Sequence, residues 1–544
     1  MRLEPYRLIK DPPLSEDYIR HFDKLRDRFD YAPHEDSSWH TRAEWLDRQE
    51  KRRAERQSVA AYLRAFNERI ENAPEALEAC SSLAREGALA VVGGQQAGLF
   101  TGPLFVIYKA ISIIRTARML EDKLNRPVVP VFWIAGEDHD LGEVDHIYQL
   151  TPDFKVEKLR LELDQNQKRP VSDIEIPQSE WERIISRMQE NAMKTEFTEP
   201  LFSRLRELAS RSRTLVELFA RMLAWLFGRY GLVLLDSHDP ELRKLEVPIM
   251  EQIVRRSELL AAHLVEGSRA VQSLGYQVQA EAEPMSANLF FIRHGERELL
   301  IRDGDRFTDR NGTNTWSVDE LVELVHSSPQ LFSNNVLTRP LVQEYLLPVG
   351  AVIVGRSEAA YWAQLREAFH LLEMKMPPVL LRDEYTLLEK TVAKHMDRYG
   401  FTLEDVLYRF DDKKEAWLKA QDEADLEGLF AETKQRLRDL YTPVIDRIST
   451  VDPGLKSLGQ TNLSKIMEQV EFLEKRAKNA IISRNEVALR HMQRIASTLN
   501  PLNRPQERVL NIVAYLNKFG DAFIHDLIHM ERNHDDLHHI AQLN

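Results

Sequence analysis

The chain has 544 residues, of which 43% are hydrophobic and 29% are charged, and its formal net charge is −13. A chain of this length exceeds the size at which one hydrophobic core keeps growing, so we expect a large core domain and a second body. The apolar content is that of a globular protein and excludes a disordered chain. The negative charge repels a phosphate backbone, and we therefore expect no nucleic acid partner.

The first residues contain no apolar signal region, and the most apolar early run, residues 128–134, is too short to cross a bilayer. Cys80 is the sole cysteine, so the chain can form neither an intrachain disulfide nor a cysteine-rich zinc site. We expect a cytoplasmic protein without membrane contact and without structural zinc.

The clearest strand is expected at residues 88–92, after a segment of helical periodicity at residues 15–80. It leads into a glycine-rich loop and a helix that extends to Leu120. A second apolar strand, residues 128–134, follows that helix, as a right-handed parallel crossover requires. This strand, loop and helix order predicts a parallel sheet.

Two further apolar strands, residues 232–235 and 351–354, extend the same sheet. Weaker alternation near residues 150–225 and 265–330 predicts insertions on the core. The predicted fold class is therefore α/β, a doubly wound parallel sheet with connecting insertions over residues 1–383.

Residues 384–500 are predicted to form an α-helical antiparallel coiled coil, because Pro453 and Gly454 interrupt two helical seams. A second arm that is continuous over residues 455–499 would be about 65 Å long. We expect the hairpin to mediate a homodimer and the apolar tail to return residues 501–544 to the core. The seam residues step by four and three: Leu426, Phe430, Thr433, Leu437, Leu440 and Val444 in the first arm, and Ile466, Val470, Leu473, Ala477 and Ala480 in the second.

Ligands of open α/β sheets bind beyond the carboxyl ends of the strands, so the residues there are site candidates. The loop after the first strand offers backbone N–H groups and a helix N-terminus to an anion, although it matches neither the dinucleotide fingerprint nor the Walker loop. The alternative is a tight turn. Lys109, on the following helix, either adds a positive charge to the site or faces solvent. The candidate binding residues of the loop are Gly94, Gln95, Gln96, Gly98, Thr101 and Gly102.

A cluster of Glu137, Asp138 and His139 follows the second strand. These groups suit general base catalysis, with His139 tuned by its carboxylate neighbours, or mixed ligation of a divalent metal. The alternative is a polar cap before a helix. Asp236 and His238 form a sparser pair after the third strand, with the same alternatives.

A third set of candidates surrounds the last predicted strand. Arginines at such positions suit carboxylate or phosphate recognition, because the guanidinium group binds these anions bidentately. For each arginine the alternative is a surface ion pair. This set contains Asn334, Asn335, Arg339, Gln343, Arg356, Ser357 and Tyr361. Five histidines near the end of the chain could bind a metal, but an exposed helical tail is the expected outcome; they are His525, His529, His534, His538 and His539.

Several long strings resemble the BshC family. They are Gly-Gln-Gln-Ala-Gly-Leu-Phe-Thr-Gly-Pro at 94–103, Tyr-Lys-Ala-Ile-Ser at 108–112, Val-Phe-Trp-Ile-Ala-Gly-Glu-Asp-His-Asp at 131–140, Arg-Pro-Leu-Val-Gln-Glu-Tyr-Leu-Leu-Pro at 339–348 and Arg-Pro-Gln-Glu-Arg at 504–508. The resemblance implies a Rossmann-like core and a coiled-coil domain that supports dimerisation. It also implies a cysteine ligase that joins cysteine to the amino group of glucosaminyl malate in the last step of bacillithiol biosynthesis.

The family is similar in its core to class I aminoacyl-tRNA synthetases, which implies carboxyl activation by ATP, accompanied by Mg²⁺ where a metal is needed. This sequence lacks a His-x-Gly-His string. Under this interpretation Asp138 or His139 takes the amine proton, and Arg339, Arg356 and Lys109 bind malate carboxylates. Two alternatives stay open, a metal-dependent hydrolase or deacetylase that uses the cluster around Asp138 and a non-catalytic coiled-coil scaffold.

Overall fold

The computed structural model describes residues 2–7, 13–163, 168–310, 312–422, 424–530 and 538–543. The chain divides into two compact units, Met1–Leu387 with Gln506–Leu543 and Leu388–Pro505. Within the described part, no helix combines the length and the apolar character needed to cross a membrane.

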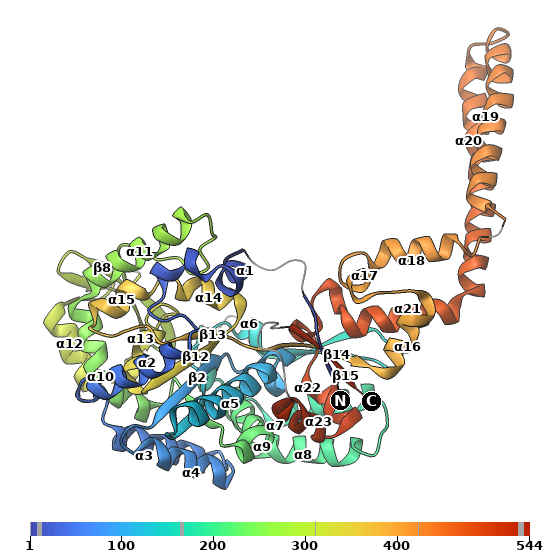
Figure 1. Ribbon diagram of the computed structural model, residues 1–544. Coiled ribbons are helices and arrows are strands. Elements are labelled where there is room, and N and C mark those ends of the chain that lie inside the picture. Colours follow the sequence, from blue (N-terminus) through green and yellow to red (C-terminus); the bar gives the residue numbers. More distant parts are fainter. Residues whose placement is uncertain are drawn as a thin grey trace. The chain divides into compact units, whose positions relative to one another are not determined.

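A five-stranded parallel sheet forms the centre of the first unit, with the strand order β13-β12-β2-β3-β6. Figure 1 labels its members β13, β12 and β2. The four strands predicted from apolar runs all belong to this sheet, which confirms the α/β fold class. The edge strand β13 was not predicted, because a run of three residues carries no periodicity. The strands are β2 (Leu89–Gln95), β3 (Val128–Ile134), β6 (Val233–Asp236), β12 (Val349–Val354) and β13 (Val379–Leu381).

Every residue of β3 is buried, as expected for a central strand whose two faces are both covered. Helix α5 (Leu104–Leu124) packs against β2 and β3, α3 (Arg56–Arg69) packs against β6, and α4 (Pro74–Leu83) packs against β3 and β6. The chain runs from β2 to β3 and β6, and then returns to β12 on the opposite side of β2. The strand order therefore reverses between β2 and β12, where ligands of such sheets bind.

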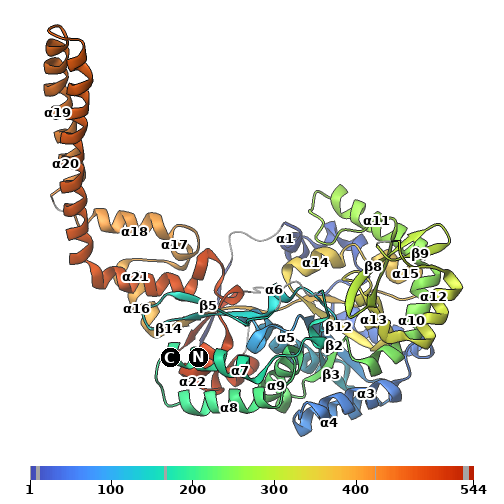
Figure 2. The same cartoon turned by 180° about the vertical axis from the view of Figure 1, so that it is seen from behind.

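Two insertions interrupt the core. The first, between β3 and β6, contains an antiparallel β4–β5 ribbon and helices α7, α8 and α9 (Figure 2). Their bounds are α6 (Leu141–Val144), β4 (His146–Leu150), β5 (Val156–Arg160), α7 (Gln178–Asn191), α8 (Thr198–Ser210) and α9 (Leu215–Phe227).

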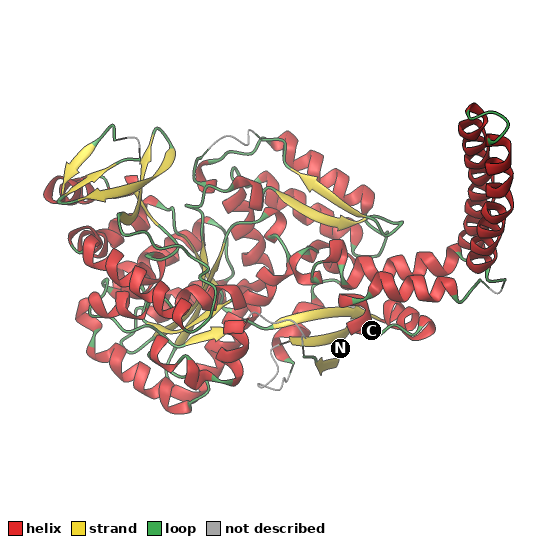
Figure 3. Cartoon of the chain, turned by 90° about the horizontal axis from the view of Figure 1, so that it is seen from above, coloured by secondary structure: helices red, strands yellow, loops and turns green. Residues whose placement is uncertain are grey.

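The second insertion contains an antiparallel sheet with the order β10-β9-β8-β7-β11, and its strands form a group apart from the central sheet (yellow in Figure 3). Its strands are β7 (Ser286–Arg293), β8 (Glu296–Asp303), β9 (Arg306–Thr308), β10 (Thr315–Ser317) and β11 (Phe332–Asn334). The helices beside it are α10 (Pro240–Arg255), α11 (Ser257–Ser273), α12 (Val318–Ser327) and α13 (Arg339–Leu346). The first unit also contains α1 (Pro13–Arg20), α2 (Asp36–Arg48), α14 (Arg356–Trp362) and α15 (Arg366–Leu371).

The two ends of the chain meet in a small antiparallel sheet. Strand β1 (Arg2–Pro5) pairs with β15 (His538–Leu543), which neighbours β14 (Glu384–Glu389). His538 and His539 are buried in this strand, so an exposed helical tail is the wrong description of them. His525 lies on α23 (Ala522–His529), which follows α22 (Ile512–Phe519), and His534 lies outside the described residues.

The second unit is helical and contains the predicted antiparallel hairpin, made of α19 (Leu426–Ser449) and α20 (Gly454–Arg484). The second arm is not continuous to residue 499, because α20 ends before Asn485 and α21 (Glu486–Leu499) follows as a separate helix. The remaining helices of this unit are α16 (Lys390–Tyr399), α17 (Leu403–Tyr408) and α18 (Phe410–Lys419).

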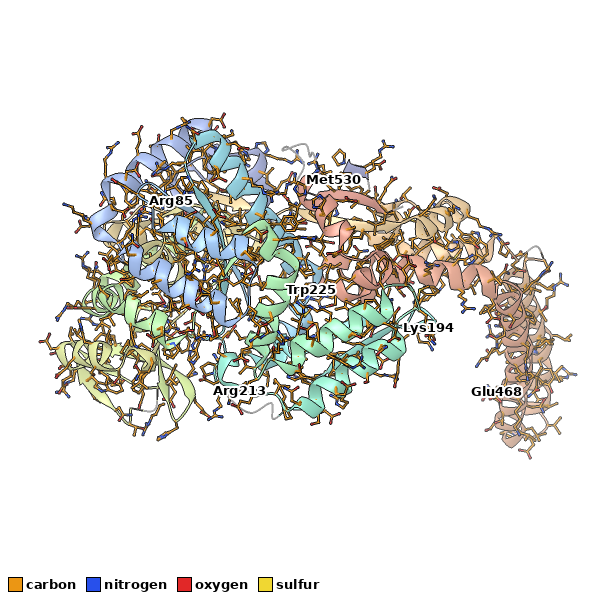
Figure 4. The ribbon with its side chains drawn as sticks, turned by 90° about the horizontal axis from the view of Figure 1, so that it is seen from below. Arg85, Lys194, Arg213, Trp225, Glu468 and Met530 are labelled. Atoms are coloured by element: carbon orange, nitrogen blue, oxygen red, sulfur yellow. The ribbon has the colours of Figure 1, made fainter. Side chains whose placement is uncertain are left out.

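The seam of the hairpin departs from the predicted register after Leu437. Ile445 is only 4% exposed and packs against Gly459, whereas Leu440 is 70% exposed. After Leu437 the less exposed hydrophobic positions of α19 are Tyr441, Ile445 and Ile448, in steps of four, four and three, which is closer to the 3.6-residue period of a straight helix than to the heptad. Predicted seam residues Leu440, Val444, Leu473 and Ala480 therefore lie outside the seam. Figure 4 marks Glu468, another exposed residue of α20.

Candidate active site

A cavity of about 410 Å³ lies where β2, β3 and the segments after β11 and β12 come together. The central sheet contributes one wall and the second insertion contributes the other. The lining residues from the central strands and their loops are Gly94, Gln95, Gln96, Trp133, Ala135, Glu137, Asp138 and His139. The remaining lining residues are Phe290, Arg297, Asn334, Asn335, Val336, Arg339, Glu358 and Tyr361.

Asp138 and His139 occupy the turn that follows β3, and both side chains are partly exposed to the cavity. One carboxylate oxygen of Asp138 accepts the backbone N–H of His139 at 2.8 Å, and the other accepts the Gln96 amide at 2.5 Å. Burial lowers the pKa of His139, and the nearby Arg297 guanidinium lowers it further, while Asp138 acts in the opposite direction. The imidazole is therefore neutral at neutral pH.

Arg297 of β8 reaches the cavity from the antiparallel sheet. Its Nε donates to Ser333 Oγ at 2.8 Å, a second nitrogen donates to the backbone oxygen of Asn334, and its Cζ lies 3.9 Å from the centre of the Phe290 ring. Its Nη1 lies 3.4 Å from His139 Nδ1. The sequence did not predict Arg297, since an arginine in an alternating strand looks like a solvent-facing residue.

Arg339, at the start of α13, is held by neutral groups. Its guanidinium donates to Gln343 Oε1 at 2.8 Å and to the Tyr361 hydroxyl at 3.4 Å, and its Cζ lies 6.0 Å from the centre of the Trp133 ring. In the part of the chain that the structure describes, it forms no ion pair with a carboxylate. Its charge is thus available to an anionic ligand, while Gln343 and Tyr361 fix its orientation.

Asn335 lines the cavity but also closes the turn before α13. Its side-chain oxygen accepts the backbone N–H groups of Leu337 and Thr338, both at 2.9 Å, and its amide donates to Asn288 at 3.0 Å. Asn334 precedes it at the end of β11 and is almost fully buried. We therefore assign Asn335 a role in positioning this wall.

Glu137 lines the cavity but is bonded to the buried Arg243 of α10. The same guanidinium donates to Glu246 at 2.6 Å, so one arginine bridges two buried carboxylates. Burial raises the pKa of Glu246 to about 7, with Arg243 opposing the shift. This pairing makes Glu137 an anchor for the turn after β3.

Lys109 does not face solvent, because its side chain is 1% exposed. Its ammonium group donates to the backbone oxygen of Gly94 at 2.7 Å, to Gln95 Oε1 at 2.9 Å and to Glu358 at 2.9 Å. An ammonium group has three hydrogens, so none is left for a ligand. Burial lowers the pKa of Lys109, while Glu358 acts in the opposite direction. Lys109 thus fastens the end of β2 to α14, and Glu358 presents the partner carboxylate to the cavity.

The remaining loop candidates, Gly98, Thr101 and Gly102, lie outside the cavity lining. A Cβ atom on Gly98 would lie 2.7 Å from the Cα of Gly102, so the two backbones touch as in a tight turn. The side-chain amide of Asn511 donates a hydrogen bond to the backbone oxygen of Gly102 at 2.7 Å. Leu104, the first residue of α5, donates its N–H to a backbone oxygen at 2.9 Å, so this helix start is not open to an anion.

Arg356 of α14 also lies outside the cavity. Its Nε donates to Glu384 at 2.9 Å, and both side chains are buried. Glu384 lies near a second buried arginine, Arg382, which is bonded to Glu507 of the C-terminal segment. The ion-pair alternative therefore describes Arg356, although the pair is internal and not on the surface.

Asp236 and His238, after β6, form a separate cluster. Asp236 accepts hydrogen bonds from Ser172 Oγ at 2.7 Å and from the backbone N–H of His238 at 3.0 Å, and burial raises its pKa. The His238 ring lies 3.0 Å from Asp173. In the described residues no three histidine, cysteine, aspartate or glutamate side chains are grouped so as to hold a metal ion.

Comparisons with known proteins agree over the whole chain. Residues 1–383 match the family described as bacillithiol biosynthesis BshC, N-terminal Rossmann-like domain, and residues 385–543 match the corresponding C-terminal coiled-coil domain. The chain is 35% identical to a protein of Bacillus cytotoxicus named "Putative cysteine ligase BshC", over 97% of each chain. It is 34% identical to a protein of the same name from Geobacillus sp. WCH70, over 100% of each chain.

A solved chain titled as a putative arginyl-tRNA synthetase from Campylobacter jejuni covers 82% of this chain and 93% of its own length. Its sequence identity is 9% and its TM-score is 0.21, which is too low to support an argument about fold.

Proposed function

This chain belongs to the BshC family of bacillithiol biosynthesis, and on that premise we propose that it is a ligase that joins the carboxyl group of cysteine to the amino group of glucosaminyl malate. The main support for this proposal is the cavity that lies where the strand order of the central sheet reverses. It holds Asp138 and His139 opposite two guanidinium groups, Arg297 and Arg339. The proposed substrates are small molecules, and the proposed location is the cytoplasm.

Amide formation requires a neutral amine, since an ammonium group cannot attack a carbonyl carbon. Asp138 is a partly exposed carboxylate in the cavity, and together with His139 it supplies the groups able to accept or orient the amine proton. The malyl group brings carboxylates, and Arg339 offers a guanidinium without a carboxylate partner in the described part of the chain. The charge pattern of the cavity therefore matches this pair of substrates.

Activation of the cysteine carboxyl by ATP, with Mg²⁺ as its companion ion, belongs to the proposal on chemical grounds, because a carboxylate is a poor electrophile. Neither the turn that the sequence offered to an anion nor Lys109, which it assigned to a malate carboxylate, supports the binding of ATP. The Gly98 to Gly102 turn is packed against Asn511, and every hydrogen of the Lys109 ammonium is already donated. We therefore assign no step to these residues.

A homodimer through the hairpin is also part of the proposal. Leu429, Leu440 and Val444 are exposed on α19, and their spacing of eleven and four residues returns to one face of a helix. Leu458 and Leu473 of α20 are exposed as well. An exposed apolar stripe of this kind is typical of a surface that pairs with another chain. A second copy of this chain is the proposed partner.

The test is a reconstitution with purified protein, glucosaminyl malate, L-cysteine, ATP and Mg²⁺, with mass detection of the product and of the nucleotide. We expect a product of the combined mass less one water, and none when any of the three substrates is omitted. An Asp138→Asn variant serves as the control for contaminating activity. Absence of product from folded protein would contradict the ligase assignment, and release of a fragment restored by metal after chelation would favour a hydrolase.

A further inference from the structure

The contact between Arg297 and His139 determines which imidazole nitrogen carries the hydrogen. Nη1 of Arg297 lies 3.4 Å from Nδ1 of His139. A guanidinium group only donates hydrogen bonds and accepts none. The Nδ1 atom that faces it must therefore present its lone pair, and the hydrogen of the neutral ring must lie on Nε2.

We propose that His139 acts as a neutral hydrogen-bond donor through Nε2, that Arg297 is the positioning residue that fixes this tautomer, and that Asp138 is the proton acceptor of the reaction. The inference rests on the proposed ligase function and deepens it. It assigns separate roles to two neighbouring residues that the sequence treats as interchangeable bases.

Several contacts hold the Arg297 guanidinium in place, so its position relative to His139 Nδ1 is fixed. Ser333 Oγ, the backbone oxygen of Asn334 and the face of the Phe290 ring hold its guanidinium in place. Rotation away from His139 would break these three contacts. The guanidinium therefore keeps a donor directed at Nδ1.

The other charged groups around the imidazole do not reverse this conclusion. Asp138 Oδ1 lies 3.8 Å from Nδ1, beyond hydrogen-bond distance, and it already accepts the backbone N–H of His139 at 2.8 Å. Asp140 raises the pKa of the imidazole and Lys168 lowers it, but burial and Arg297 are the two largest influences and both lower it. Nε2 makes no hydrogen bond with any residue that the structure describes, so its hydrogen is available to a ligand.

The reaction step follows from these assignments. The amine nitrogen of glucosaminyl malate forms a bond to the carboxyl carbon of cysteine, which carries an oxygen leaving group of the acyl phosphate or acyl adenylate class. The bond from that carbon to the leaving oxygen breaks, and its electron pair leaves with the oxygen. The amine proton passes to the Asp138 carboxylate. His139 Nε2 donates a hydrogen bond to the oxygen that gains negative charge, and loss of such a donor typically lowers the rate by about a hundredfold to a thousandfold.

The first experiment is NMR of the full-length protein with ¹⁵N-labelled histidine, in which the His139 signals are identified by their loss from the His139→Asn variant. We expect Nε2 to carry the hydrogen at pH 7 and the ring to become charged only below the usual pH range of histidine. In Arg297→Gln the pKa of the ring should rise by about one unit, a typical effect of removing a nearby charge. The Arg297→Lys variant keeps the charge and should shift less. A hydrogen on Nδ1, a charged ring at pH 7, or an unchanged pKa in Arg297→Gln overturns the inference.

The second experiment compares rates. A glutamine at position 139 can place an amide N–H near the position of Nε2 but cannot accept a proton there, whereas alanine does neither. We expect His139→Gln to retain at least about ten times the rate of His139→Ala, as a donor role requires. Asp138→Asn should lose about a hundredfold to ten-thousandfold, as expected for a lost general base. Equal rates for His139→Gln and His139→Ala, or a nearly unaffected Asp138→Asn, contradict the assignment.

The two experiments separate this inference from the proposed function. The NMR measurement needs no turnover. If the protein shows the expected tautomer but has no ligase activity, the proposed function is wrong and the role of Arg297 in fixing the tautomer is retained. A ligase with the opposite tautomer would keep the function and overturn the inference.

Discussion

Glu358 accepts hydrogen bonds from Lys109 at 2.9 Å through each of its carboxylate oxygens, and this pair joins α5 to the first turn of α14, while Lys109 also donates to the end of β2. The two residues are 249 positions apart in the sequence. Because Glu358 also lines the cavity, the pair links the stability of the sheet to the shape of the site.

Replacement of Lys109 by Met should destabilise the protein without removing a ligand contact. Removing one partner of a buried ion pair costs about 3 to 5 kcal/mol, and we expect about 2 to 3 kcal/mol here because Glu358 is 29% exposed and keeps some solvent. Urea denaturation measures the change. The exposed pair of Lys244 and Glu241 provides the control, and Lys244→Met should change the free energy of unfolding by less than about 0.5 kcal/mol. Equal effects of the two substitutions would contradict the pairing.

Glu246 should make the stability fall between pH 4.5 and pH 7. Its pKa is raised from 4.5 to about 7 in the folded protein, so in this window the folded state keeps a proton that the unfolded state has lost. Stability gained from that proton is complete below pH 4.5 and is lost as the pH rises through 7. In Glu246→Gln the side chain stays neutral, and urea denaturation at several pH values should show a shallower decline.

The exposed Glu241 on the same helix provides the matched control, since Glu241→Gln should leave the decline unchanged. A decline in Glu246→Gln as steep as that of the parent protein would show that another group titrates in this window.

Arg339 and Arg356 should respond in opposite ways to the same substitution. Arg339→Gln removes a guanidinium that the cavity keeps for an anion, so we expect kcat/KM for glucosaminyl malate to fall about tenfold to a hundredfold with little change in stability. Arg356→Gln removes one of the two buried arginines beside Glu384, leaves Arg382 at 3.6 Å, and should lower the free energy of unfolding by about 1 to 3 kcal/mol. Steady-state kinetics and urea denaturation of both variants distinguish the two roles. A selective loss of affinity for glucosaminyl malate in Arg356→Gln would show that the anion site is not the one at Arg339.

The sequence could predict the central sheet because parallel strands buried on both faces read as unbroken apolar runs, as β3 does. It could also predict that residues at the carboxyl ends of these strands lie together, and Asp138 and His139 do line the cavity, which Arg339 enters from the start of α13. It could not separate Arg339 from Arg356, because the carboxylate that pairs with Arg356 belongs to another strand. Nor could it find Arg297, since the placement of the second insertion decides which face of β8 meets the site.

The sequence also failed to predict in full which residues pack between the two helices of the hairpin. The predicted seam and the observed one agree up to Leu437 and then differ by a single residue, so that Ile445 is buried in place of Val444. Periods of 3.5 and 3.6 residues differ too little for a short helix pair to reveal the change from sequence. This shift of one residue has a large effect, because the apolar residues that it moves out of the seam are exposed on the surface of the hairpin.

Two copies of the chain are expected to meet at this exposed apolar surface. If the exposed stripe of α19 and α20 joins two copies of the chain, then Leu440→Glu together with Leu473→Glu should convert a dimer to a monomer, because a charged side chain in an apolar interface loses its hydration. Light scattering coupled to gel filtration measures the mass. Both residues lie outside the intrachain seam, so the helical content should not change. Met193→Glu, at a similarly exposed apolar position of the first unit, serves as the control and should leave the mass of the parent protein unaltered. An unchanged dimer mass in the double variant would show that the stripe does not mediate dimerisation.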